Sequence, residues 1–163
     1  MGEVVIRAMG AEEPDDAGDV AAVLMGSWGS TLVVGRGVAR DASRLPGFLA
    51  ERNGVVVGLL TYDVRGGELE VVTVDALERG GGTGTLLVEA AVARARELGL
   101  RRVWLITTND NLDALRFYQR RGFRLAALYP NAIEAARRIK PAIPEVGAYG
   151  IPIRDELELE YPL

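Results

Sequence analysis

The sequence predicts an α+β fold made of a single domain over residues 1–163. Three observations lead to this prediction. The chain has 163 residues, which is about the length of one domain. Strand-like β-branched runs joined by Asn-Gly and Gly-Gly turns fill residues 47–75, a pattern typical of an antiparallel meander. Strand-like and helical patterns then alternate from residue 83 to residue 129, which predicts strand–helix units after the meander.

The first half of the chain contains one expected helix and four expected strands. Pro14 and the acidic residues after it predict a helix that runs to Met25, because carboxylates are favourable in the first turn of a helix. Residues 26–44 are rich in glycine and give no clear pattern. The turns Asn53-Gly54 and Gly66-Gly67 separate strand-like runs of β-branched residues. Strands are therefore expected at residues 4–8, 47–51, 55–64 and 68–75.

The second half contains three expected helices. In the helix at 83–98, apolar residues recur at about 3.6-residue spacing on one face; they are Leu87, Ala90, Ala91, Ala95 and Leu98. Gly99 is expected to end this helix, Asn111 to cap the next one at 112–121, and Gly122 to end it. A further helix is expected at 131–139, a proline- and glycine-rich loop after it, and strands at 102–108, 123–129 and 156–161.

The composition limits the chemistry that the chain can perform. It contains no Cys and no His, which excludes disulfides, thiolate metal sites and imidazole catalysis. We expect no metal, and catalysis that uses carboxylates, hydroxyls, backbone groups or a bound cofactor. The net charge of −4 and the pI near 5.0 argue against binding to nucleic acid or to an anionic membrane. The N-terminal residues lack the pattern of a signal peptide, and no apolar run is long enough for a membrane span, so a cytoplasmic location is expected.

A glycine-rich turn precedes the helix at 83–98. The first turn of a helix exposes backbone N–H groups that have no internal partner, and the helix dipole adds about half a positive charge there. Gly80, Gly81 and Gly82 carry no side chains that would keep a ligand away from those groups. Arg79 adds a cation at the entry of the turn. These features predict a site for a phosphate or a diphosphate.

Two common phosphate motifs are absent from this turn. A Walker A loop requires a Lys beside a Ser or Thr at the start of the helix, and no Lys is near. The spacing G-x-G-x-x-G also fails, because Thr85 or Leu87 stands where its last glycine would be. The motif that is present is R-x-x-G-x-G, formed by Arg79, Gly82 and Gly84.

A second segment accompanies this motif. A polar turn that ends in Asn111 follows the strand at 102–108, and the next helix carries Ala114, then Phe117-Tyr118, then Gly122-Phe123. The two segments, in this order and separated by one helix and one strand, resemble the GNAT family of N-acetyltransferases over roughly residues 54–129.

The resemblance implies a three-layer α/β arrangement. Helices would flank a mixed, mostly antiparallel central sheet, and two parallel strands would splay apart at the acyl-CoA site. It further implies acetyl-CoA as co-substrate, direct attack on the thioester by a small-molecule or peptide amine, and a homodimer as one possible assembly. The N–H of Val74 would be the donor to the oxyanion. The cofactor-binding residues that it implies are Val72, Thr73, Val74, Arg79, Gly80, Gly81, Gly82, Thr83, Gly84, Thr85, Asn111 and Tyr118.

Three residues are candidates for proton transfer. Glu68 and Glu70 lie two positions apart on one strand and therefore share a face. The resemblance implies a basic carboxylate on this strand, and Glu70 is slightly favoured because apolar residues follow it directly, while Glu68 or a chain of waters stays open. The resemblance also implies that Tyr118 is the general acid beside the CoA sulfur. Tyr118 lies about 100° further round the helix than Phe117, so we expect Phe117 to pack the helix on the sheet.

Two other functions stay open at this point. A non-catalytic acyl-CoA-binding or sensor module would use the same turn, and an acyltransferase could use a longer acyl donor. The acceptor cannot be read from the sequence, because the segments that would shape its site, 26–44 and 129–155, are the least regular ones. Acidic residues that could attract a cationic acceptor are Glu68, Glu70, Asp155 and Glu156.

Overall fold

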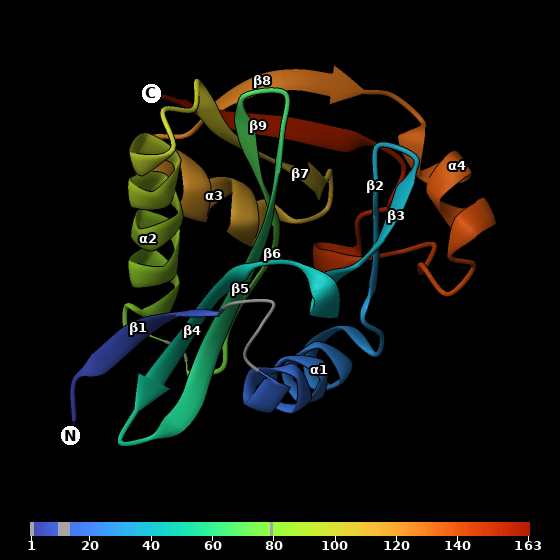
Figure 1. Cartoon of the computed structure of the whole chain (residues 1–163). Coiled ribbons are helices and arrows are strands. Elements are labelled where there is room, and N and C mark those ends of the chain that lie inside the picture. Colours follow the sequence, from blue (N-terminus) through green and yellow to red (C-terminus); the bar gives the residue numbers. More distant parts are fainter. Residues whose placement is uncertain (1, 10–13, 79) are drawn as a thin grey trace. The chain divides into compact units, whose positions relative to one another are not determined.

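The computed structural model describes residues 2–9, 14–78 and 80–163 (Figure 1). The chain divides into two compact units. The first unit comprises residues 1–32, 41–103 and 163, and the second comprises residues 33–40 and 104–162. The strand β7 (Arg102–Thr108) begins in the first unit and continues into the second.

The first unit contains the predicted antiparallel meander. Its strands are β1 (Val4–Met9), β4 (Gly47–Arg52), β5 (Val55–Arg65) and β6 (Glu68–Ala76), in the order β1-β4-β5-β6 with every neighbour antiparallel. Asn53 and Gly54 join β4 to β5 with φ angles of 52° and 78°, which is the left-handed backbone that the Asn-Gly pair predicts. The predicted strands of this half are confirmed to within one or two residues at their ends.

Two α-helices belong to the first unit, α1 (Pro14–Trp28) and α2 (Thr83–Glu97) (Figure 1). Helix α2 packs against β4, β5 and β6, and its residues Leu87, Ala91 and Ala95 are fully buried as predicted. Leu98 was expected on the same face, and this is wrong: it is exposed, because it follows the last helical residue, where Gly99 turns the chain with a φ of 68°. Among the described residues, no helix is both long enough and apolar enough to cross a membrane.

The second unit contains strands in the order β7-β9-β8, with β8 (Arg124–Tyr129) antiparallel to β9 (Glu156–Pro162). Its helices are α3 (Leu112–Arg120) and α4 (Ala132–Ile139). Ile133 and Ala136 of α4 form a small apolar core with Ile153, and Val34 packs against it. The α+β class with mostly antiparallel strands is thereby confirmed.

The glycine-rich segment 26–44 completes α1 and then forms a short hairpin. Its strands are β2 (Leu32–Gly35) and β3 (Val38–Asp41), followed by the 3₁₀ helix η1 (Ala42–Arg44). Arg36 and Gly37 form the turn, with φ angles of 51° and 72°. A second 3₁₀ helix, η2 (Ala148–Gly150), lies in the loop before β9.

The burial of α2 can be tested with two neighbouring leucines. Leu87 is fully buried and Leu86 is exposed. Leu87→Ala should lower the free energy of unfolding by about 2–5 kcal/mol, because it leaves a cavity between α2 and the sheet. Leu86→Ala should change it by only about 0.5 kcal/mol. Chemical denaturation of both variants measures the difference, and equal losses would contradict this packing.

Candidate active site

The glycine turn lies between β6 and α2, where the sequence predicts an anion site. Gly80 and Gly82 have φ angles of 76° and 74°, a backbone that residues with a side chain rarely adopt. Gly82 is the N-cap of α2 and has no side chain that could cap the helix. A helix N-terminus that begins at a glycine is an arrangement suited to binding anions. Arg79 lies outside the described residues.

Strand β6 contains a bulge at Val72. Thr61 of β5 is opposite Thr73 and Tyr62 is opposite Val71, so Val72 has no partner on β5. A bulge takes one residue out of the regular ladder and re-aims its main-chain groups. Thr73 points its side chain inward, where its hydroxyl lies 2.7 Å from the hydroxyl of Thr61 in the core. Of Thr73, only the main chain is therefore available to a ligand.

The two candidate carboxylates of β6 have different surroundings. The carboxylate of Glu68 lies 3.1 Å from Nε of Arg102 and 3.5 Å from the guanidinium of Arg101. Glu70 is half-buried and lies opposite Asp63 on β5. Two acidic residues directly opposite each other repel when both are ionised. Glu68 is thus paired with two cations, and Glu70 lies opposite Asp63, whose carboxylate is 3.0 Å from Nε of Arg65.

The remaining candidates, Asn111 and Tyr118, lie in the second unit. The side-chain oxygen of Asn111 accepts a hydrogen bond of 3.2 Å from the N–H of Ala114, which confirms its prediction as the cap of α3. Tyr118 is only 8% exposed, and its ring contacts Phe117 and Phe123 with centroid distances of 5.1 and 5.3 Å. Phe117 is half-buried, less buried than Tyr118, and the guanidinium of Arg121 lies 3.6 Å from its ring centroid.

The turn before α3 holds the loop that precedes β9, a role that the sequence pattern did not reveal. The amide oxygen of Asn109 accepts hydrogen bonds from the N–H groups of Arg154 and Asp155, at 2.9 and 3.0 Å. The buried carboxylate of Asp110 accepts another from the N–H of Ala148, at 2.9 Å. The proline- and glycine-rich segment after α4 is therefore fixed to the turn before α3 by side-chain hydrogen bonds.

Glu156 is a buried carboxylate in the second unit, with only 2% of its surface exposed. Both of its oxygens accept from the N–H of Arg36, at 3.2 and 3.3 Å, and the guanidinium of Arg36 lies 3.8 Å away and over the ring of Tyr129. Burial raises the pKa of the Glu156 carboxyl, and the hydrogen bond and charge of Arg36 partly oppose this. Glu156 thus anchors the β2–β3 turn.

The expectation that Asp155 and Glu156 attract a cationic acceptor finds no support in this unit. The carboxylate of Asp155 accepts a hydrogen bond of 2.8 Å from the N–H of Asn131, at the start of α4. Glu156 is buried and bound to Arg36. Both side chains therefore hold the local structure together.

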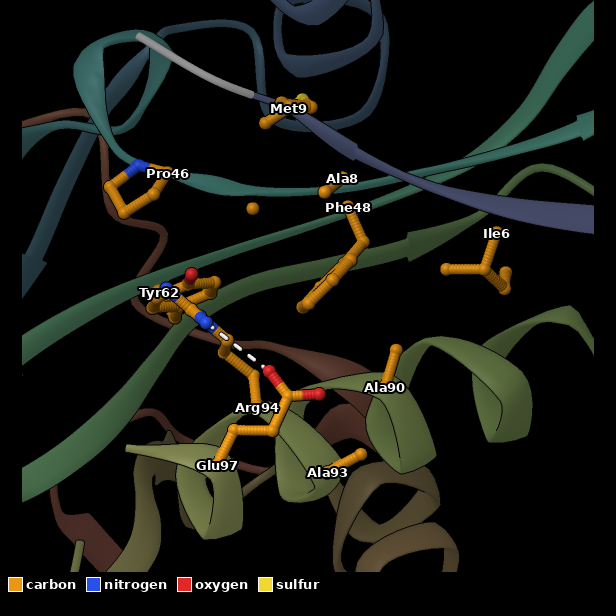
Figure 2. Close-up of a pocket in the computed structure, with 11 residues that line it drawn as sticks. Ile6, Ala8, Met9, Pro46, Phe48, Tyr62, Ala90, Ala93, Arg94 and Glu97 are labelled. Carbon is orange, nitrogen blue, oxygen red and sulfur yellow. Dashed lines mark hydrogen bonds and ion pairs between the residues drawn. The ribbon is translucent and has the colours of Figure 1, made fainter. Parts of the chain in front are cut away.

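A pocket of about 700 Å³ lies elsewhere in the first unit, along the second half of α2. Figure 2 shows Arg94 and Glu97 joined by a hydrogen bond of 3.2 Å near the aromatic pair Phe48 and Tyr62. The residues that line the pocket come from β1, β4, β5, α2 and the segment before β4, and they include none of the predicted site residues. The pocket is therefore separate from the glycine turn.

Comparison of the sequence with known proteins finds matches to one protein family. A sequence model of the acetyltransferase (GNAT) family matches residues 25–123, which include β6, the glycine turn and α3. The chain is 42% identical to the protein YdhI of Bacillus subtilis (strain 168) over 132 residues, which cover 80% of this chain and 82% of that protein.

Two solved structures share the fold over nearly the whole chain. An IAA acetyltransferase from Bacillus cereus ATCC 14579 matches with a TM-score of 0.75 and 25% identity, over 99% of this chain and 100% of that one. An acetyltransferase from Bacillus subtilis in complex with CoA matches with a TM-score of 0.74 and 22% identity, over 99% of both chains.

The burial of Glu156 predicts a pH dependence of stability. Because its pKa is raised in the folded protein, the stability that it contributes is complete below its ordinary pKa of 4.5 and is lost as the pH rises through the folded value. Glu156→Gln, which keeps an acceptor for Arg36, should match the wild type in acid and become the more stable protein as the pH rises. Denaturation at several pH values measures this, with the exposed Glu134→Gln as control. A constant difference between wild type and Glu156→Gln would contradict the assignment.

Proposed function

Because the chain belongs to the GNAT acetyltransferase family, we propose that it transfers the acetyl group of acetyl-CoA to a primary amine. Family membership makes it an acetyl-CoA-dependent acyltransferase. The observation that carries the proposal is the N-terminus of α2, which has a glycine as its N-cap and follows a glycine-rich turn. The thioester is already activated, so the amine attacks it directly. No covalent intermediate on the enzyme is required, in agreement with a chain that has neither Cys nor His.

The cofactor is proposed to bind in two parts. Its diphosphate accepts hydrogen bonds from the backbone N–H groups of residues 80–85, with Arg79 as a further donor. Its pantetheine amides pair with the main chain of Val72, Thr73 and Val74, which the bulge in β6 supports by removing Val72 from the ladder with β5. We also propose that Asn111, a residue of the second unit, contacts the cofactor.

The amine must lose a proton before it attacks. An alkylammonium with a pKa of about 10.4 costs roughly 4–5 kcal/mol to deprotonate at pH 7. We propose Glu70 as the base, acting directly or through water. One feature supports it over Glu68: the carboxylate of Glu68 is already paired with Arg101 and Arg102. Glu70 also lies opposite Asp63, and two neighbouring carboxylates attract a cationic amine.

The collapse of the tetrahedral intermediate needs an acid. The amine nitrogen bonds to the carbonyl carbon and gives up its extra proton, the carbon–sulfur bond breaks, and the thiolate takes a proton. We propose that the hydroxyl of Tyr118 donates this proton and that the N–H of Val74 stabilises the oxyanion. The aromatic contacts with Phe117 and Phe123 support a fixed orientation of the Tyr118 ring.

One observation favours a second function, a non-catalytic acyl-CoA-binding module. Tyr118 is largely buried among aromatic rings, which is also what a purely structural tyrosine would show. Release of free thiol from acetyl-CoA across a broad panel of amines separates the two functions. Acetyl transfer to at least one amine supports the enzyme, and saturable CoA binding without any transfer supports the module.

The choice of base can be tested with two matched variants. Glu70→Gln should lower turnover by about 100-fold or more and flatten its dependence on pH, because the proton acceptor is lost. Glu68→Gln should keep the pH profile, because its carboxylate is held by two arginines. Steady-state turnover of both variants, measured from about pH 6 to about pH 9, gives the two pH profiles. An unchanged profile in Glu70→Gln would remove this residue from the mechanism.

The role of Tyr118 can be tested by removing its hydroxyl alone. Tyr118→Phe keeps the ring that packs against Phe123, so the fold should be preserved. We expect kcat to fall by about 100-fold while the Kd for CoA changes by less than about twofold, because the proton is needed only when the thiolate leaves. Full activity of the variant would refute the role.

A further inference from the structure

Arg52, the last residue of β4, lies against the glycine turn. Its Nη2 is 3.1 Å from the carboxylate of Glu78, which precedes the turn, and its Nη1 donates a hydrogen bond of 2.9 Å to the carbonyl of Gly2. The side chain is only 16% exposed. A largely buried arginine side chain therefore lies beside the backbone that the proposed function assigns to a diphosphate.

The contacts around Gly81 show how closely the side chain of Arg52 approaches the glycine turn. Gly80 and Gly82 require glycine because of their positive φ angles, but Gly81 does not have one. A Cβ built on Gly81 would lie 3.4 Å from Nη2 of Arg52, 3.7 Å from the carboxylate of Glu78 and 3.8 Å from the hydroxyl of Thr83. A guanidinium, a carboxylate and a hydroxyl thus lie close to Gly81.

Two polar atoms of this group have no partner. Among the described residues, Nε of Arg52 and the hydroxyl oxygen of Thr83 are buried and make no hydrogen bond. Thr83 itself is 1% exposed and is the first residue of α2. Buried polar groups without partners cost free energy, and they are uncommon in folded proteins unless a ligand or an ion completes them. Both atoms belong to side chains that border the space beside Gly81.

We propose that Arg52 and Thr83 belong to the diphosphate subsite, and that Glu78 holds Arg52 in place until the cofactor binds. This inference rests on the proposed function, because the anion is the diphosphate of CoA. The carboxylate of Glu78 is a temporary partner: it is 42% exposed and can turn into solvent. Arg52 then exchanges this carboxylate for phosphate oxygens, which pair well with a planar guanidinium, and the Thr83 hydroxyl gains an acceptor.

The test compares two ligands, one with the diphosphate and one without it. Wild type, Arg52→Gln, Arg52→Lys and Thr83→Val are titrated with CoA, and their kinetics are measured with acetyl-CoA and with S-acetylpantetheine. Arg52→Gln should weaken CoA binding about tenfold and raise KM for acetyl-CoA while kcat stays the same. Arg52→Lys should recover part of the loss, and Thr83→Val should show a smaller loss. The kcat/KM for S-acetylpantetheine should be unchanged in all three variants.

Two controls separate ligand binding from structure. Arg44→Gln removes the same charge from a side chain of the same unit that is 86% exposed, and it should leave CoA binding unchanged. Glu78→Gln removes the carboxylate that competes with the diphosphate, so it should tighten CoA binding by about threefold. If Glu78 serves only to hold the turn, Glu78→Gln will weaken binding, and the proposed exchange is overturned.

Different experimental results would overturn this inference and the proposed function. If the wild type binds CoA and transfers its acetyl group, but folded Arg52→Gln and Thr83→Val bind CoA as tightly as the wild type, the subsite assignment is wrong and the function stands. Equal losses with acetyl-CoA and with S-acetylpantetheine would also overturn the assignment, because they indicate a general structural role. A wild type that does not bind CoA overturns both.

Discussion

The proposed chemistry depends on the N–H groups at the N-terminus of α2. A helix leaves its first amides without partners inside the helix, and the N-cap here is Gly82, which has no side chain to cap them. The left-handed backbone of Gly80 and Gly82 brings the chain to this helix without covering its end. The helix itself is held by a fully buried row, Leu87, Ala91 and Ala95, packed on the meander. The buried core therefore holds the helix whose N-terminus forms the proposed anion site.

Strand β6 connects this anion site to the proposed chemistry. Its inward side chains fix it in the sheet, most clearly through the buried contact between the hydroxyls of Thr73 and Thr61. The bulge at Val72 interrupts the ladder with β5 and leaves main-chain groups for another partner. The two glutamates lie further back along the same strand, and the arginines beside Glu68 distinguish it from Glu70. One strand thus carries the proposed pantetheine contact, oxyanion donor and base.

The sequence predicted the regular elements well and the site only in part. Asn53-Gly54, Gly99 and Asn111 were read correctly because each acts through its own backbone conformation or a cap within a few residues. The hairpin β2–β3 was missed because it depends on a distant contact, from Arg36 to the buried Glu156. Arg52 was missed for the same reason: nothing near it in the sequence indicates that it reaches the glycine turn. The sequence also did not show which of two adjacent aromatic rings is buried, and Tyr118 is more buried than Phe117.

A crystal structure of the protein with CoA bound tests the proposed anion site most directly. We predict diphosphate oxygens at about 2.7–3.2 Å from the backbone nitrogens of the glycine turn and the first turn of α2. CoA bound with its diphosphate away from residues 80–85, or a glycine turn left empty in crystals that contain CoA, would contradict this prediction.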